Sequence, residues 1–257
     1  MHITLTGNLG SGKSTVCRIL EQQYGFEIYS TGKVIRSIAD EMGISVLEMN
    51  ELMTKDHKYD HMIDDRTAQI SRENPDKSIL FDSRLAWHFV EKSFKVFLSV
   101  DLAEAARRVF ADASRGEVES YKSEADAAEQ LAARAANEDA RYYEIYGIRY
   151  FDFNNYNLVL DSSFLSPSRI AEALMGEARA CHTWDGYGKT GRMLVSPKRL
   201  GFESDKEVSF EHGYVYPEPV KIAVSGNTFT VTEGKEIAQK AADDGYAYVA
   251  ATLCDAE

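Results

Sequence analysis

The first fifteen residues hold the pattern in this chain that points most directly to a chemistry. Residues 7–15 read Gly-Asn-Leu-Gly-Ser-Gly-Lys-Ser-Thr, between a short apolar run and a helical one. This is the G-x-x-x-x-G-K-S pattern of a phosphate-binding loop, in the strand-to-helix context that such a loop requires. Its glycines let backbone N–H groups approach phosphate oxygens, and the helix N-terminus favours an anion. The pattern predicts a nucleoside triphosphate site formed by Gly7, Gly10, Ser11, Gly12, Lys13, Ser14 and Thr15.

A carboxylate and an arginine follow a predicted buried strand at residues 78–82. Lys13 supplies charge to the β- and γ-phosphates, and the Ser14 hydroxyl suits Mg²⁺. Asp82 stands where it can reach the Mg²⁺ shell through water, and Arg84 is placed to hold an acceptor phosphate bidentately. The alternative is an ordinary turn Asp beside a surface Arg. With the phosphate loop upstream, we favour the functional interpretation and expect ATP and Mg²⁺ as cofactors.

A second candidate acceptor contact follows the short apolar strand at residues 26–29. Ser30 and Gly32 open a predicted helix, and Arg36 lies one helical turn further on. We expect Arg36 to face the acceptor phosphate. The alternative is that Arg36 is simply solvated, as charged residues on helices usually are.

A long predicted helix at 123–146 carries two arginines and a carboxylate on one face. Arg134, Glu138 and Arg141 have i, i+4, i+7 spacing, so they lie on the same side of the helix. They could clamp phosphates and contact a ribose hydroxyl. The alternative is an intrahelical ladder of salt bridges.

Three further arginines bracket a short segment that suits a lid closing over ATP: Arg107, Arg108 and Arg115. Phosphoryl transfer asks for positioning and charge neutralisation rather than covalent chemistry. The residues expected to act in catalysis are therefore Lys13, Arg84, Arg108, Arg134 and Arg141.

Several separated blocks, in order along the chain, resemble the cytidylate kinases, and most closely their short archaeal-type branch within the nucleoside monophosphate kinases. These blocks are Gly7–Thr15, Ser30-Thr-Gly-Lys-Val-Ile-Arg36, Asp82-Ser-Arg84-Leu-Ala, Arg134 with Arg141-Tyr-Tyr-Glu-Ile-Tyr-Gly-Ile-Arg149, and Tyr156-Asn-Leu-Val-Leu-Asp-Ser-Ser163. The resemblance covers about residues 1–180. It implies phosphorylation of CMP or dCMP by ATP, with an acceptor-binding insert at about 30–75 and a lid at about 108–125.

The resemblance also implies roles for individual residues. Lys13 and Ser14 would serve ATP–Mg²⁺, and Ser30, Gly32, Arg36, Arg84, Glu138 and Arg141 would bind the acceptor. Leu85 stands where the longer bacterial enzymes carry an Asp that helps to read cytosine. The acceptor therefore stays open between CMP, dCMP, AMP, UMP and another small molecule such as a cofactor precursor. A nucleotide-dependent switch with the C-terminal region as its output is an alternative of another class.

The elements that position these residues alternate between strand and helix. This order predicts an α/β fold of the P-loop NTPase type, a parallel sheet with helices on both faces; the resemblance implies five strands. Ligands bind at the carboxyl ends of such strands. The phosphate loop, Ser30, Asp82 and the end of the strand at Val100 should therefore converge on one edge of the sheet.

The character of the sequence changes near His182. Residues 182–192 hold several glycines and are interpreted as a linker between a kinase domain at 1–181 and a small α+β module at 193–257. The module weakly resembles the ParB/sulfiredoxin-like fold, but Gly234-Lys-Glu-Ile237 lacks the arginine of that fold's phosphate-binding turn. We interpret it as a module that docks a protein partner or regulates.

Composition and charge limit the partners. The chain has 257 residues and a net charge of −12, which disfavours nucleic acid and anionic membranes and leaves small nucleotides as partners. It has no apolar run long enough to cross a bilayer. Three widely spaced cysteines indicate a reducing cytoplasm.

One polar helix poses a separate question. His57, Asp60, His61, Asp64 and Asp65 have helical spacing that could bind a metal. No general-base Glu follows the zinc-protease pattern. We interpret them as a solvated helix face.

Overall fold

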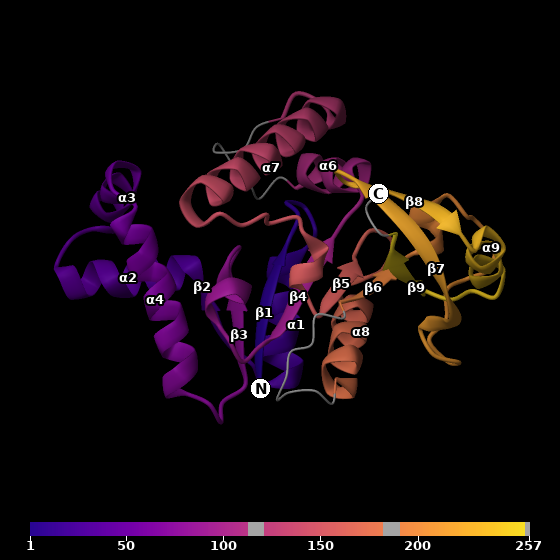
Figure 1. Ribbon diagram of the computed structural model, residues 1–257, viewed down its shortest axis with the longest axis horizontal. Coiled ribbons are helices and arrows are strands. Elements are labelled where there is room, and N and C mark those ends of the chain that lie inside the picture. The colour runs from indigo at the N-terminus through magenta and orange to yellow at the C-terminus, as the bar shows by residue number, and fades with distance from the viewer. Residues whose placement is uncertain (113–120, 182–190, 255–257) are drawn as a thin grey trace.

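The computed structural model describes residues 1–112, 121–181 and 191–254, apart from the side chains of residues 50 and 54. The strands of this part of the chain form one sheet, in the order β2-β3-β1-β4-β5-β6-β9-β7-β8 (Figure 1). They are β1 (His2–Gly7), β2 (Glu27–Ser30), β3 (Ile79–Asp82), β4 (Phe94–Ser99), β5 (Leu158–Asp161), β6 (Arg192–Val195), β7 (Val215–Ser225), β8 (Thr228–Glu233) and β9 (Tyr248–Leu253). The helices are α1 (Lys13–Tyr24), α2 (Thr31–Met42), α3 (Val46–Lys55), α4 (Lys58–Glu73), α5 (Ala86–Phe89), α6 (Leu102–Ala111), α7 (Glu124–Tyr146), α8 (Pro167–Ala180) and α9 (Lys235–Asp243).

The central strands pair in parallel, and the helices that connect them cover both faces of the sheet. All six residues of β1 are buried between β3 and β4, which pair with it in parallel register. Strands buried on both faces read as continuous rather than alternating apolar runs. The predicted parallel α/β sheet with helices on both faces is therefore confirmed.

Alternate residues of each strand contribute to two cores. On one face, Leu5, Val96 and Leu160 pack with α1 and α8. On the opposite face, Phe97 and Val159 pack with aromatic residues that include Trp87, Tyr150 and Tyr156. This division follows from the two-residue period of a strand.

The C-terminal strands continue the same sheet. β6 pairs with β5 in parallel register, with Leu158 opposite Arg192, and β9 then pairs with β6. Met193 and Val195 share a core with Phe97, and Leu194 joins the core on the other face. Because β6 is apolar on both sides, it needs cover on both faces, as an inner strand has. The expected module at 193–257 is thus joined to the main sheet rather than set apart from it. The expected linker lies mostly outside the described residues.

Two groups of helices flank the carboxyl edge of the sheet. α2, α3 and α4 coincide with the expected insert at about 30–75 and pack on each other through a small core of their own. α6 and α7 lie across the carboxyl edge (Figure 1). Of the lid expected at about 108–125, residues 113–120 lie outside the described residues, and Arg115 with them.

The helix boundaries follow local capping signals. The Ser123 side chain accepts a hydrogen bond from the Asp126 N–H at 3.1 Å, and Gly147 ends α7 in the left-handed conformation. Ser45 and Glu48 form the capping box that their spacing predicts at the start of α3. These caps fix the start of α3 and both ends of α7, the helix that lies across the carboxyl edge.

Candidate active site

The loop between β1 and α1 has the conformation that its glycines permit. Gly7, Gly10 and Gly12 all have positive φ. A Cβ at Gly7 would come within 2.2 Å of the Leu98 carbonyl oxygen, and one at Gly10 within 2.9 Å of the Ala105 Cβ. Any side chain at Gly7 or Gly10 would therefore push the loop away from β4 or α6.

One buried hydroxyl in this loop has no partner within the part of the chain that the structure describes. Ser11 is 1% exposed, and its Oγ makes no hydrogen bond there. Buried polar atoms are almost always paired in native structures. The orphan hydroxyl therefore fits a loop that receives a phosphate oxygen. Ser14 and Thr15, in the first turn of α1, are exposed.

The carbonyl oxygen of Gly7 gathers three donors. It accepts from Arg84 Nη1 at 2.6 Å, from the Tyr150 hydroxyl at 2.8 Å and from Lys13 Nζ at 3.4 Å. Burial, and then the neighbouring Arg84 charge, lower the pKa of Lys13 to about 8. Lys13 has no ion-pair partner among the described residues, so its ammonium is held ready for an anion.

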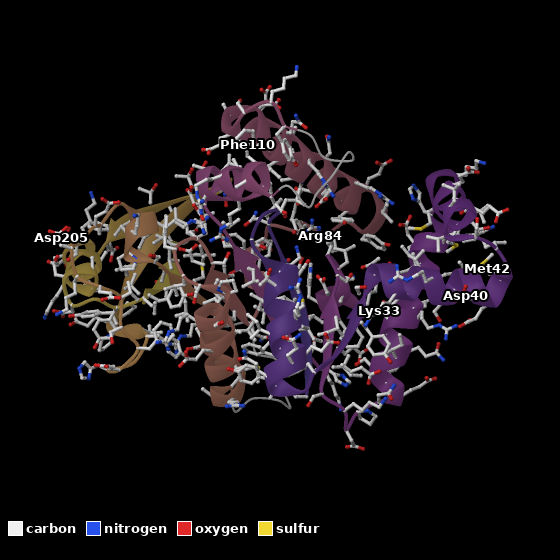
Figure 2. All side chains as sticks on the ribbon, turned by 180° about the vertical axis from the view of Figure 1, so that it is seen from behind. Lys33, Asp40, Met42, Arg84, Phe110 and Asp205 are labelled. Carbon is white, nitrogen blue, oxygen red and sulfur yellow. The ribbon has the colours of Figure 1, made fainter. Side chains whose placement is uncertain are left out.

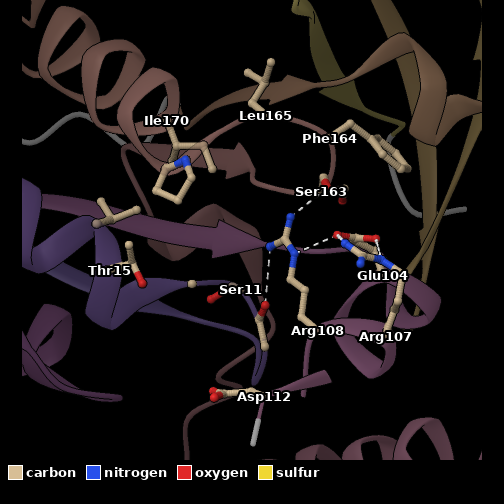
Figure 3. A pocket seen from close by; sticks show the side chains of 14 residues that line it. Ser11, Thr15, Glu104, Arg107, Arg108, Asp112, Ser163, Phe164, Leu165 and Ile170 are labelled. Carbon is tan, nitrogen blue, oxygen red and sulfur yellow. Dashed lines mark hydrogen bonds and ion pairs between the residues drawn. The ribbon is translucent and has the colours of Figure 1, made fainter. Parts of the chain in front are cut away.

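A cavity of about 560 Å³ opens beside the phosphate loop. Figure 3 shows Arg108 reaching across it from α6. Arg108 donates to the carbonyl oxygens of Ser162 at 2.8 Å and Ser163 at 2.7 Å, and it pairs with Glu104 at 2.8 Å. Phe164 adds an aromatic wall. The cavity thus combines a fixed cation with apolar surface, as a nucleotide site requires.

Arg84 joins the phosphate loop to α7. Figure 2 shows its side chain between the sheet and α7. Its Nε lies 3.1 Å from Glu138 Oε2, and Arg134 Nε lies 3.3 Å from the other Glu138 oxygen. Arg134, Glu138 and Arg141 were predicted to share one helix face. On that face, Glu138 pairs with Arg134 within α7 and also with Arg84 in the loop after β3.

Arg141 turns from that ladder toward the α2–α4 group. Its Nη2 lies 3.0 Å from Asp60 Oδ1 on α4. A small cavity of about 110 Å³ lies here, between α4, α7 and the loop after β3. Its lining includes Asp60, Asp64, Arg84, Leu85, Arg141, Tyr142 and Tyr146.

Asp60 and Asp64 correct the interpretation of α4 as a solvated face. His57, His61 and Asp65 are exposed, but Asp60 and Asp64 are half-buried and turn toward α7. The Tyr146 hydroxyl donates to Asp64 Oδ2 at 2.5 Å. Burial raises the pKa of Asp64 to about 6. The i, i+4 spacing was visible in the sequence, but it does not tell which helix face is covered.

The other predicted residues lie along the same edge. Ser30 and Leu5 each lie opposite Asp82 on neighbouring strands, so the predicted convergence holds at this point. Ser30 Oγ caps α2 by accepting from the Lys33 N–H at 3.3 Å. Arg36 is exposed, and its Nη1 folds back over Gly32, 3.6 Å from where a Cβ would stand. The structure therefore leaves Arg36 at the surface rather than in the small cavity.

The described residues contain no cluster of three or more His, Cys, Asp or Glu side chains that could hold a metal. Ser14 and Asp82, the residues predicted to reach Mg²⁺, offer one hydroxyl and one carboxylate. Mg²⁺ prefers oxygen ligands and usually keeps several waters beside phosphate oxygens, so this sparse donor set fits it.

A model of the cytidylate kinase-like family matches residues 2–164, more than half of the chain. The chain belongs to this family. A cytidylate kinase from Methanocella arvoryzae is 33% identical over 163 residues, 63% of this chain and 88% of that protein. One from Natronomonas pharaonis is 33% identical over 192 residues, 74% of this chain and 95% of that protein. Family membership makes the chain a phosphotransferase, specifically a nucleoside monophosphate kinase.

The fold is shared more widely than the sequence. The crystal structure of an uncharacterized protein from Eubacterium ventriosum aligns with a TM-score of 0.53 at 13% identity. The alignment covers 70% of this chain and 99% of that one. In the described part of this chain, every helix is too short or too polar to cross a bilayer.

Proposed function

We propose that this member of the family transfers the γ-phosphoryl group of ATP to CMP or dCMP, in line and without a covalent intermediate. The observation that carries the proposal is the Gly7 carbonyl, which accepts from both Lys13 and Arg84. One backbone atom thereby fixes a donor-side cation relative to an acceptor-side cation. Phosphoryl transfer depends mainly on such positioning and on charge neutralisation.

On the donor side, the phosphate loop would hold ATP through its N–H groups, Ser11 and Lys13. Arg108 would neutralise charge on the transferred group, because Glu104 and two carbonyls hold it at the cavity beside Gly10. Ser14 and Asp82 would hold Mg²⁺, which when bound neutralises charge on the phosphate oxygens.

On the acceptor side, Arg84 would bind the phosphate of the monophosphate and Arg141 its sugar–phosphate edge. The carboxylates of Asp60 and Asp64 line the adjoining small cavity. A carboxylate accepts from the exocyclic amino group of cytosine. Uracil presents a carbonyl oxygen at that position, which two acidic side chains would repel. The acidic pair therefore supplies a base contact where Leu85 offers only apolar surface.

The test is ADP release with ATP and Mg²⁺ across CMP, dCMP, UMP, AMP and GMP. We expect kcat/KM for CMP or dCMP to exceed that for UMP at least tenfold. The Lys13→Ala variant, purified identically, controls for contaminating kinases and should be inactive. Preference for AMP would reassign the base, since adenine also carries an amino group. Equal rates with and without every monophosphate would contradict the proposal.

A further inference from the structure

A buried ion pair ties the C-terminal part of the chain to the carboxyl edge of the main sheet. Arg199 Nη1 lies 3.0 Å from Asp161 Oδ1, and the two side chains are 2% and 0% exposed. Arg199 belongs to a short 3₁₀ turn, Pro197–Leu200, directly after β6, whereas Asp161 ends β5. The other Asp161 oxygen accepts from the Ser196 N–H at 3.1 Å. Such a pair forms only when both parts of the chain are in place.

The same arginine holds the turn between β7 and β8. Its Nη2 donates to Asn227 Oδ1 at 3.0 Å and to the Asn227 carbonyl at 3.1 Å. Its Cζ lies 4.0 Å from the centre of the Phe229 ring. A planar, forked guanidinium can make these contacts together, and a lysine ammonium cannot.

From Asn227 the contacts lead to the phosphate loop. Asn227 Nδ2 donates to the Val100 carbonyl at 2.8 Å. The N–H of Val100 donates to Asn8 Oδ1 at 3.2 Å, and Asn8 is the second residue of the phosphate loop. Val100, directly after β4, is therefore held by the phosphate loop through its N–H and by the C-terminal hairpin through its carbonyl.

A second route leads from Asp161 to Arg108. Ser163 Oγ donates to Asp161 Oδ1 at 2.5 Å and accepts from the Asp101 N–H at 2.8 Å. The Asp101 carboxylate caps α6, the helix that carries Arg108. Arg108 in turn donates to the Ser163 carbonyl. Asp161 thus lies between Arg199 and the helix on the donor side of the site.

We infer that Arg199 and Asn227 are positioning residues for ATP, acting through Val100–Asn8 and Asp161–Ser163. The C-terminal segment is then part of the frame of the nucleotide site rather than a separate regulatory module. The inference rests on the proposed function only for its donor substrate, ATP. Loss of either side chain should weaken ATP binding more than binding of the acceptor, because both routes end on the donor side.

The experiment compares Asn227→Ala and Arg199→Lys with the full-length wild type. Asn227→Ala leaves the Arg199–Asp161 pair intact, so it is the variant expected to fold. Gln239→Ala on α9 is the matched control, since within the described part of the chain its amide donates only to the Glu203 carbonyl and to Asp243 Oδ1. The readouts are the calorimetric Kd for ATP without acceptor, the KM values for ATP and for the acceptor, and the melting temperature.

We expect the Kd and KM for ATP to rise about tenfold in Asn227→Ala, with the acceptor KM within twofold of wild type. Gln239→Ala should match the wild type. Unchanged ATP affinity in both variants, or an equal rise in both KM values, would overturn the inference. If the wild type binds ATP but phosphorylates no monophosphate, the proposed function fails while the Kd values still decide the inference. A wild type that binds no ATP would overturn both.

Discussion

Glu138 on α7 holds Arg84 and Arg134 at once, with N–O distances of 3.1 and 3.3 Å to its two oxygens. Arg84 also donates to the Gly7 carbonyl at 2.6 Å, so its guanidinium has a fixed direction before any acceptor binds. A preorganised cation loses little entropy on binding a phosphate, which makes it a better anchor than a free surface arginine. The effect of removing Arg84 should therefore exceed that of removing the half-exposed Arg134.

We predict that Arg84→Ala raises the acceptor KM by roughly 10- to 100-fold and also lowers kcat, since hydrogen bonds to charged groups contribute about 1.5–3 kcal/mol. The ATP KM should change little. Steady-state kinetics with the acceptor varied at saturating ATP measure this. Arg84→Lys keeps the positive charge without the planar set of guanidinium donors, so it should recover only part of the lost acceptor binding. An acceptor KM like that of the wild type in Arg84→Ala would show that Arg84 does not contact the acceptor.

Lys13 gives a pH-dependent prediction. Its pKa in the folded protein is lowered from 10.5 to about 8, so the free enzyme loses this charge as the pH rises through 8. ATP binding favours the charged form. Above pH 8 the Kd for ATP should therefore rise, by up to about tenfold per pH unit. Calorimetry at pH 7, 8 and 9 measures it.

Lys13→Arg is the matched control, because a guanidinium stays charged throughout this range. Its Kd should be nearly flat from pH 7 to 9, whatever its absolute value. The same pH slope in both proteins would assign the titration to another group. ATP affinity and folding stability respond to pH in opposite directions. Between pH 8 and 10.5 the unfolded chain binds more protons at Lys13 than the folded protein does, so the free energy of unfolding rises with pH across that window.

Local constraints made much of this site predictable from sequence. The glycines of the phosphate loop, the buried strand before Asp82 and the caps of α7 each depend on residues a few positions apart. Contacts between the C-terminal segment at 193–257 and the rest of the site could not be predicted in this way. Asp161 lies within the block at 156–163 that resembles the kinase family, but its partner Arg199 comes from a segment expected to form a module of its own. The three buried residues of β6 are also too short an apolar run to predict from sequence that the sheet continues through this strand.

The covered face of α4 was unpredictable for a different reason. Acidic residues at i, i+4 look alike whether the helix faces solvent or a cavity. Only the position of α7, which brings Arg141 and Tyr146 against Asp60 and Asp64, decides the matter.

Asp64 should make stability depend on pH. Its pKa is raised from 3.8 to about 6 by burial, so the folded protein binds more protons than the unfolded chain between these values. Stability contributed by its protonated form is therefore present below pH 3.8 and is lost as the pH rises through 6. Asp64→Asn removes the titrating group and keeps an acceptor for Tyr146. We expect the free energy of unfolding of Asp64→Asn to exceed that of the wild type by on the order of 2 kcal/mol at pH 7 and to equal it at pH 4.

Urea unfolding at pH 4, 5, 6 and 7 measures this difference. Asp65→Asn, on the exposed side of the same helix, controls for net charge. If both variants shift alike with pH, the raised pKa of Asp64 is not the cause.

In the kinase assay, Asp64→Asn should also reduce the preference for CMP over UMP, since it replaces a carboxylate that only accepts hydrogen bonds by an amide that can also donate them.

Removing the chain after residue 181 should unfold the protein rather than release an active kinase domain. The cut would uncover the β5 edge, which pairs with β6, and would expose Phe97 and Val159, which share a core with Met193 and Val249. Each large apolar side chain that becomes exposed loses roughly 1.5–3 kcal/mol of stabilisation, whereas the free energy of unfolding of a whole domain is only about 5–15 kcal/mol. We expect fragment 1–181 to aggregate or to lack a cooperative melt. Co-expression with residues 182–257 should restore soluble protein that binds ATP, whereas a soluble 1–181 fragment with wild-type ATP affinity would show that the C-terminal strands are dispensable.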